Sequence, residues 1–125
     1  PETVPPEFSD RTLYHHNPQV TLMRTNDREC ALIGAFIGEK LNAMNGPVRF
    51  FLNEGGLSTL DAEGQPFHAP SANAALFQAL ESTVHQTGQR QVIRVPHHIN
   101  APEFAQQVVA TFRSLTGGAA KQRKV

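Results

Sequence analysis

The sequence predicts a three-layer α/β fold with helices on both faces of a parallel sheet. One pattern occurs three times along the 125 residues: a short apolar strand, a polar loop and an amphipathic helix. Strands that alternate with helices of this length favour a parallel sheet joined by right-handed crossovers. Two of the helices also begin with residues that fit a capping box, a reciprocal side-chain bonding pattern at helix starts. The expected arrangement is therefore Rossmann-like or flavodoxin-like.

Length and composition indicate one globular domain or a part of one. Hydrophobic residues make up 39% of the chain and charged residues 18%, which is not the composition of a disordered protein. The first residue is Pro1 rather than Met, so we expect a chain that is processed or excerpted from a longer one.

The charge balance and the apolar runs argue against two classes of partner. Eleven basic residues balance eleven acidic ones, whereas nucleic-acid binders usually have a basic excess, so no nucleic acid is expected. No apolar run approaches the roughly 18–20 residues that cross a bilayer, so no membrane partner is expected. Cys30 is the only cysteine, which excludes an internal disulfide and fits a cytoplasmic location.

The first unit follows a Pro-rich linker or arm at residues 1–10. A short strand is predicted near residues 11–14. The helix after it is predicted to start at Asn26, because Asn26 and Glu29 have the spacing of a capping box. It is expected to end at residues 45–47, Asn-Gly-Pro, since glycine suits a left-handed cap and proline cannot continue a helix.

The second and third units repeat the arrangement. Residues 48–52 and 91–95 are apolar strands, and each is followed by a polar loop. Apolar residues at helical spacing then predict helices over residues 71–86 and 101–115. The last nine residues, 117–125, are small, polar and basic, and are expected to form a flexible tail.

The predicted domain, residues 11–116, is expected to be incomplete. Three strands make a small sheet, and a parallel sheet is normally covered on both faces. We therefore expect a preceding domain of the same protein, or a partner chain, to complete it, and we expect a homo-oligomer. Gly34 and Gly38 leave a smooth helix stripe, which close packing on the sheet or on a neighbouring helix explains. A dimer contact is the alternative.

The loops after the three strands are the expected ligand-binding region. The carboxyl ends of parallel strands lie at one edge of the sheet, and ligands bind in the crevice there. Residues 15–26, 53–70 and 96–100 should therefore meet. Their candidate ligand-binding or anion-binding residues are Asn17, Thr21, Arg24, Thr25, Asn26, Gly55, Gly56, Ser58, His98 and Asn100.

Arg24 stands directly before a predicted helix start. The free backbone N–H groups and the positive end of the helix dipole favour an anion there, and a guanidinium would add a fork of donors. In the alternative interpretation, Asn26 only caps the helix and Arg24 is solvated or paired with an acid.

The remaining candidates are less specific. Gly55-Gly56 allows a close approach to a ligand, but a flexible turn explains it equally well, and neither phosphate-binding glycine fingerprint is present. Ser58 lacks the sequence context of a nucleophile elbow. His97 and His98 are adjacent, so they point to opposite sides of an extended chain and no metal site is expected. Either could transfer protons or serve as a hydrogen-bonded structural residue.

Four segments in this order resemble an ATP-binding family of largely uncharacterised bacterial, fungal and plant proteins: HNPQVTLMRT, LNAMNGPV, GGLSTLDAEGQPF and HHINAPEFA. This family includes the tomato mosaic virus resistance protein. The resemblance covers nearly the whole chain and corresponds to the C-terminal portion of a region with two Rossmann-like domains. It implies ATP binding mainly through the first of these domains, which this chain lacks. The matched motifs contain all the candidates above except Asn26, and also Asp61.

Three functions stay open at this point. The first is a domain fragment whose strand-end loops, with an anion at Arg24, contribute to a small-molecule or phosphate site shared with the preceding domain. The second is an enzyme in which a loop histidine acts as acid or base beside Asp61 or Glu54. The third is an oligomerisation or protein-interaction module without catalysis, which would bury the face of Gly34 and Gly38.

Overall fold

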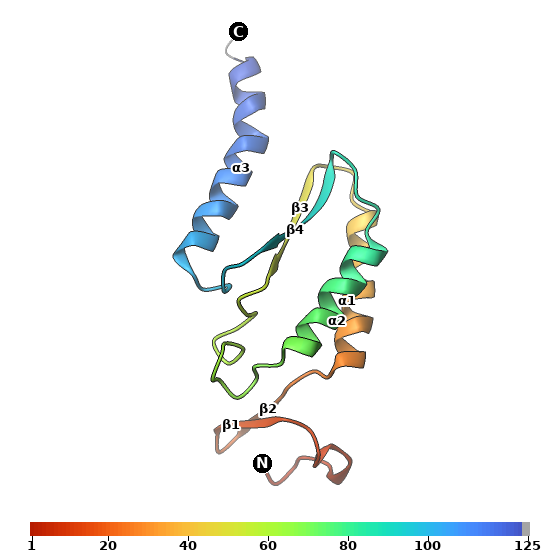
Figure 1. Cartoon of the computed structure of the whole chain (residues 1–125), viewed down its shortest axis with the longest axis vertical. Helices are drawn as coiled ribbons and strands as arrows, with labels where there is room; N and C mark the ends of the chain where they lie inside the picture. The colour runs from red at the N-terminus through yellow and green to blue at the C-terminus, as the bar shows by residue number, and fades with distance from the viewer. Residues whose placement is uncertain (124–125) are drawn as a thin grey trace.

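The computed structural model of the chain describes residues 1–123 (Figure 1). Its elements, in chain order, are a 3-10 helix η1 (Pro6–Phe8), strands β1 (Leu13–Asn17) and β2 (Val20–Met23), helix α1 (Asp27–Asn42), strand β3 (Val48–Asn53), helix α2 (Pro70–Thr83), strand β4 (Arg90–Val95) and helix α3 (Pro102–Arg123). None of the helices in residues 1–123 is long and apolar enough to span a membrane.

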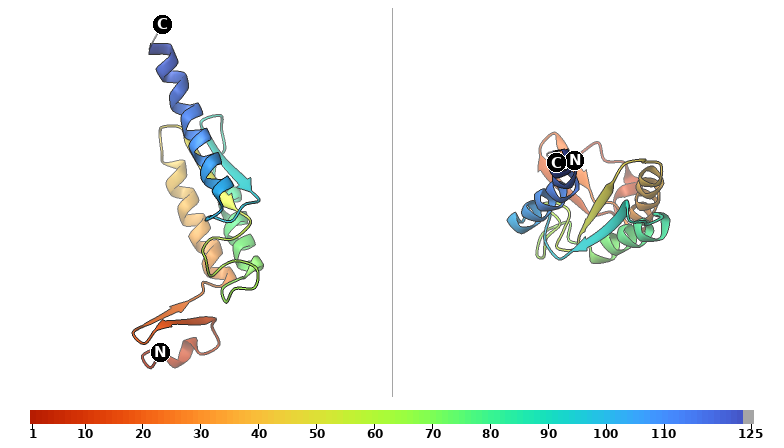
Figure 2. Two further views of the ribbon diagram at one scale, coloured as in Figure 1. Left: turned by 90° about the vertical axis from the view of Figure 1, so that its left-hand side faces the viewer. Right: turned by 90° about the horizontal axis from the view of Figure 1, so that it is seen from above.

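The central sheet is small and parallel. Strands β3 and β4 pair in parallel, with Val48 opposite Arg90 and Asn53 opposite Val95. Helices α1 and α2 lie on one side of these strands and α3 lies on the other, so the strands form the middle of three layers (Figures 1 and 2). The expected mixed α/β architecture with a small parallel sheet is therefore confirmed.

The first predicted unit is wrong in its topology. Strand β1 does not join the parallel sheet but pairs antiparallel with β2, with Leu13 opposite Met23. The reason is the turn between them: the side chain of Asn17 accepts a hydrogen bond from Gln19 N–H, which reverses the chain just before Val20. Residues 15–26 are therefore mostly a β-hairpin, shown below α1 in Figure 1, and not a loop at the end of a parallel strand.

The two glycines of α1 pack against α2. A Cβ atom on Gly34 would lie 2.5 Å from the carbonyl oxygen of Leu76, and one on Gly38 would lie 2.8 Å from the side chain of Thr83. Close helix packing is thus confirmed as the explanation of this stripe. An oligomer that buries the same stripe is excluded in this fold, because α2 already occupies it.

The core lies between the α1–α2 pair and the sheet. Its buried members are Leu41, Leu52, Phe77, Leu80 and Val84. Cys30 of α1 is also buried. The capping box at the start of α1 is confirmed, because Asn26 and Glu29 bond each other's backbone N–H groups.

Helix α3 differs most from expectation. Apolar residues at helical spacing normally mark a buried face, but in α3 Phe112 is 63% exposed and Val108 is 36% exposed. At its first turn the ring of Phe104 meets Phe51 of β3 edge to face, with centroids 5.8 Å apart. The helix also continues past the expected end at residue 115 to Arg123. The last two residues of the expected tail lie outside the described part of the chain.

Candidate functional site

A pocket of about 190 Å³ lies at the carboxyl end of the parallel strands. We call it the strand-end pocket, and it is lined by Glu54, Gly55, Gly56, Asp61, His68, Pro70, Asn73, Ala74, Phe77 and Arg94. The loop after β3 supplies one wall, the first two turns of α2 supply another, and Arg94 comes from β4. This is the edge at which parallel sheets bind ligands.

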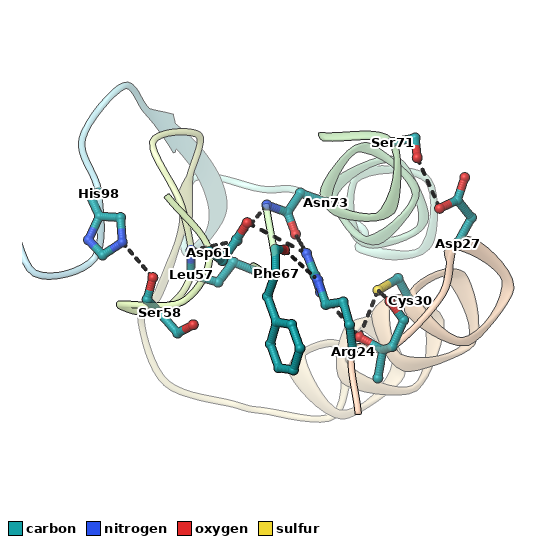
Figure 3. A network of polar contacts seen from close by, with 11 residues as sticks. Arg24, Asp27, Cys30, Leu57, Ser58, Asp61, Phe67, Ser71, Asn73 and His98 are labelled. Carbon is teal, nitrogen blue, oxygen red and sulfur yellow. Dashed lines mark hydrogen bonds and ion pairs between the residues drawn. The ribbon is translucent and has the colours of Figure 1, made fainter. Parts of the chain in front are cut away.

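One wall of this pocket is held by a buried polar network (Figure 3). Asp61 is 3% exposed and accepts hydrogen bonds at Oδ2 from Leu57 N–H, at 2.9 Å, and from Asn73 Nδ2, at 2.7 Å. Its other oxygen, Oδ1, has no hydrogen-bond partner in the described residues but lies 3.7 Å from Nη2 of Arg24. Burial of a carboxylate requires this kind of compensation.

Arg24 forms the other half of this network. Its guanidinium donates to the carbonyl oxygen of Phe67 at 3.0 Å, to Asn73 Oδ1 at 2.6 Å and to Thr25 Oγ1 at 3.2 Å. The side chain is only 12% exposed. Most of its donors are therefore engaged within the protein. The geometry favours the interpretation in which Arg24 pairs with an acid and Asn26 caps α1.

A second hollow, of about 240 Å³, has Arg24 in its wall. Arg24, Thr25 and Asn26 line it, together with Asp10, Arg11, Thr12, Asp27, Ala69 and Ala72. Thr25 Oγ1 also lies 3.2 Å from the sulfur of Cys30, which fixes it to the start of α1. The predicted anion-binding trio is therefore kept together, but it lines a different hollow from Gly55 and Gly56.

Gly55 and Gly56 allow two loops of this chain to touch. A Cβ on Gly55 would collide with the backbone of His97 and His98, and one on Gly56 would collide with the carbonyl oxygen of Asp61. Gly56 also has a φ of 128°, which side chains other than that of glycine rarely adopt. The loops after β3 and β4 thus meet as predicted, and the close approach is made by backbone.

His98 is bonded at both ring nitrogens. Its Nδ1 accepts from the backbone N–H of Asn100 at 3.0 Å, so the proton of the neutral ring is on Nε2, which donates to the carbonyl oxygen of Ser58 at 2.7 Å. The side chain of Asn100 donates to Thr59 Oγ1 at 3.2 Å. His98, Asn100 and Ser58 therefore join the two loops and do not line the strand-end pocket. This arrangement favours the structural interpretation of His98 over proton transfer.

Asn17 and Thr21 lie in the β1–β2 hairpin, away from both of these hollows. Asn17 bonds Gln19 within the turn. Thr21 Oγ1 is buried and has no hydrogen-bond partner among the described residues. The ten candidates therefore separate into a hairpin group, a group around Arg24 and a loop-contact group, and only Gly55 and Gly56 line the strand-end pocket.

Arg94 was not predicted, although a cation inside an apolar strand is a visible signal. It leaves β4 on the side of α2, where its guanidinium lies 5.5 Å from the ring centroid of Phe77. It donates to both oxygens of Glu81, at 2.6 and 2.9 Å, and to Glu54 at 3.3 Å. These hydrogen bonds lower the pKa of Glu81 and raise the pKa of Arg94.

Asn73 and His68 were also missed. Asn73 is the polar residue on the buried face of α2, whose other buried members are apolar, so its position in the helical pattern could have been noticed in the sequence. His68 is exposed at the pocket, and nothing in the sequence distinguishes it from the other histidines. Among the described residues, no group of three or more histidine, cysteine or acidic side chains could hold a metal ion.

The charges of the strand-end pocket do not fit ATP, the cofactor that the family resemblance implies. Glu54 and Asp61 are carboxylates, and the guanidinium of Arg94 already bonds two acids. A triphosphate would bring more negative charge beside these carboxylates in a partly buried site, which is unfavourable. Acceptor oxygens at this pocket are better matched by a ligand that donates hydrogen bonds.

The fold and the site together identify the chain as part of an α/β domain that is built on a parallel sheet. Within that class, the chain belongs to the family described as "Uncharacterised protein family (UPF0261) C-terminal domain", which matches residues 1–116. It is 55% identical over 115 residues to a UPF0261 protein of Rhizobium meliloti, covering 92% of this chain and 29% of that protein.

Two tomato proteins are also similar. The "ToMV resistance protein Tm-1(GCR237)" of Solanum lycopersicum is 41% identical over 114 residues, covering 91% of this chain and 15% of that protein. The "ToMV susceptible protein tm-1(GCR26)" of the same species is 40% identical over the same length, with the same shares covered. The chain thus spans less than a third of each of these three relatives. Because a protein named for resistance and a protein named for susceptibility match almost equally well, this similarity does not indicate a role in virus resistance.

Proposed function

We propose that the strand-end pocket binds a small polar molecule through hydrogen-bond acceptors, as one half of a site that the rest of the full-length protein completes. The observation that carries this is the pocket itself, at the carboxyl end of β3 and β4, with a glycine pair in one wall and Phe77 beneath Arg94. Sites of this kind combine an aromatic surface with a few placed polar groups.

The ligand class follows from the groups at the pocket. Glu54 presents a carboxylate that is 44% exposed and bonds only one nitrogen of Arg94. Asn73 and Asp61 are held rigidly by their mutual hydrogen bond and by Arg24. A hydroxyl-bearing or amine-bearing molecule would complement Glu54, whereas the phosphate ligand considered from the sequence would be repelled by it. Proton transfer, if the site has chemistry, would fall to His68, the histidine at this pocket.

A binding screen tests the proposal on both the full-length protein and this chain. Ligand-observed NMR with three small sets of compounds, polyols, amines and phosphate esters, should show binding for polyols or amines and weaker or no binding for phosphate esters. Ala74→Leu adds bulk at an exposed position in the pocket wall and should weaken binding at least tenfold. Gln78→Leu makes a comparable change one turn further along α2, outside the pocket, and should leave binding unchanged.

Two results would overturn this function. Equal binding by Ala74→Leu and Gln78→Leu would place the ligand elsewhere on the protein. Binding confined to phosphate esters, and strengthened by Glu54→Gln, would show that the pocket is an anion site and that the acceptor argument is wrong.

A further inference from the structure

We infer that the open edge of β3 is the docking site for a β-strand supplied by the part of the full-length protein that precedes this chain. The inference concerns assembly of the fold and stands independently of the ligand proposed above. It rests on the backbone groups at the two sheet edges, on the apolar surface beside one of them, and on the length of the relatives.

The two edges of the sheet are not equivalent. The N–H of Val48 bonds the residue just before β4, and the N–H of Glu54 bonds the last residue of β4. The alternation of a parallel strand therefore directs the N–H groups of Arg49, Phe51 and Asn53 to the opposite edge. In the described residues no strand pairs with that edge. A row of unpaired groups at the edge of a sheet is a template for another strand.

The outer edge of β4 is already blocked by its own chain. Val92 N–H donates to the side chain of Gln86 at 3.0 Å. Arg90 N–H donates to the hydroxyl of Thr87 at 3.1 Å. Two of the outward N–H groups of β4 are therefore satisfied, and an added strand is expected at β3 alone.

The helices leave apolar surface beside the β3 edge. Seen from above in Figure 2, α1 lies on the β3 side of the sheet and α2 on the β4 side. Ile33 and Leu41 share one row of α1, yet Leu41 is 5% exposed over the sheet while Ile33 is 41% exposed. Phe36, on the next row outward, is 60% exposed. A strand paired with β3 would lie under these residues.

Helix α3 points to the same edge from the opposite face. The connection from β3 through α2 to β4 covers one face of the sheet, and α3 leaves β4 on the other face. On that other face a right-handed connection runs in the opposite direction, back over β3. After its contact with Phe51, the apolar stripe of α3 becomes progressively more exposed, to 63% at Phe112. Both faces beside the β3 edge thus present unburied aromatic residues to an incoming layer.

The length of the relatives indicates which segment would supply the strand that pairs with β3. The chain matches 29% of the Rhizobium meliloti protein, and the matching family is described as a C-terminal domain. Most of such a protein would therefore precede the matched region. A segment tethered to the same polypeptide has a high effective concentration, which favours it over a second copy of this chain.

Co-expression tests the inference. The chain, carrying an affinity tag, is produced together with the part of the Rhizobium meliloti protein that lies outside the matched residues, and the amount of this partner recovered per chain is measured. Arg49→Pro removes one edge N–H donor, while Arg49→Ala removes the same side chain and keeps that donor. We expect recovery with Arg49→Ala to equal that of the unmodified chain, and recovery with Arg49→Pro to be at least tenfold lower.

A second pair of variants leaves the backbone of β3 intact. Phe36→Asp places a charge on the exposed apolar surface of α1 beside the β3 edge and should reduce recovery of the partner at least tenfold. Val20→Asp, at an exposed apolar position in the hairpin, should leave recovery unchanged. Circular dichroism of each variant chain establishes that it is folded. The inference is overturned if the two polypeptides fail to co-purify, if neither Arg49→Pro nor Phe36→Asp lowers recovery, or if the β3 edge pairs with a second copy of the chain instead.

Discussion

Replacement of Arg24 by alanine is the substitution whose effect follows most directly from the structure. Three hydrogen bonds, to Phe67, Thr25 and Asn73, would be lost together with the ion pair to Asp61. Asp61 is 4% exposed at its side chain, so its charge would remain buried without a compensating cation. Removing one partner of a buried ion pair costs about 3–5 kcal/mol.

This cost is large for a chain of 125 residues. Domains of this size are stable by about 5–15 kcal/mol in total, and each kcal/mol corresponds to roughly 4 °C in Tm at this length. Arg24→Ala is therefore expected to lower Tm by roughly 10–20 °C. Differential scanning calorimetry or thermal circular dichroism measures this directly. Arg28→Ala, at an exposed position four residues away, is the matched control and should change Tm by less than about 2 °C.

A double-mutant cycle separates the ion pair from the hydrogen bonds. If the burial of Asp61 causes the loss, Asp61→Asn should be less harmful in the Arg24→Ala background than in the unmodified chain, with a coupling of about 1 kcal/mol or more. A Tm for Arg24→Ala that matches the control would refute the reasoning. Arg24 would then be free to serve as the anion-binding residue that its position in the sequence predicts.

The helix contact and the surface ion pair give two further expectations. Gly34→Ala forces a methyl group against the carbonyl oxygen of Leu76 and should lower the free energy of unfolding, measured by urea denaturation, by about 1–3 kcal/mol. Gly46→Ala, with no atom within 4 Å of the added Cβ, should be neutral or slightly stabilising. Equal effects of the two substitutions would contradict the packing of α1 on α2. Glu81 has a pKa lowered by its hydrogen bonds from Arg94, so it stabilises the fold above its ordinary pKa and loses this effect as the pH falls through the lowered value. Because both side chains are more than a third exposed, Glu81→Gln should cost less than about 1 kcal/mol at pH 7, and this cost should shrink as the pH falls. A cost that grows towards acid would have the wrong sign.

Local chemistry made much of this fold predictable. The capping box of Asn26 and Glu29 locates the start of α1, and the apolar runs locate β3 and β4 close to their observed limits. The spacing of Gly34 and Gly38 predicts a close helix contact. Each of these features is encoded by residues only a few positions apart, so a short stretch of sequence is enough to recognise it.

The topology of the first strands was not predictable in the same way. The segment that precedes α1 has strand character whether it pairs with β3 or with itself, and the sequence does not state its partner. In the structure, the hydrogen bond from Gln19 N–H to the side chain of Asn17 closes the turn of a hairpin. Asparagine makes the same kind of bond in many loops, so its presence in the sequence does not identify a hairpin. Long-range pairing is a property of the whole chain, so a local pattern leaves it open.

The candidate site shows the same division. The sequence by itself determined that polar and glycine residues gather in the loops around the helix starts, because caps, turns and close approaches demand those residue types. Only the tertiary structure decided which of them face a pocket. It brought Asp61 and Asn73 to Arg24 across 37 and 49 positions of sequence, and so converted a free cation into a buried ion pair. The free energy of burying a charge depends on what surrounds it in space, and that neighbourhood is not written in the residue's own stretch of chain.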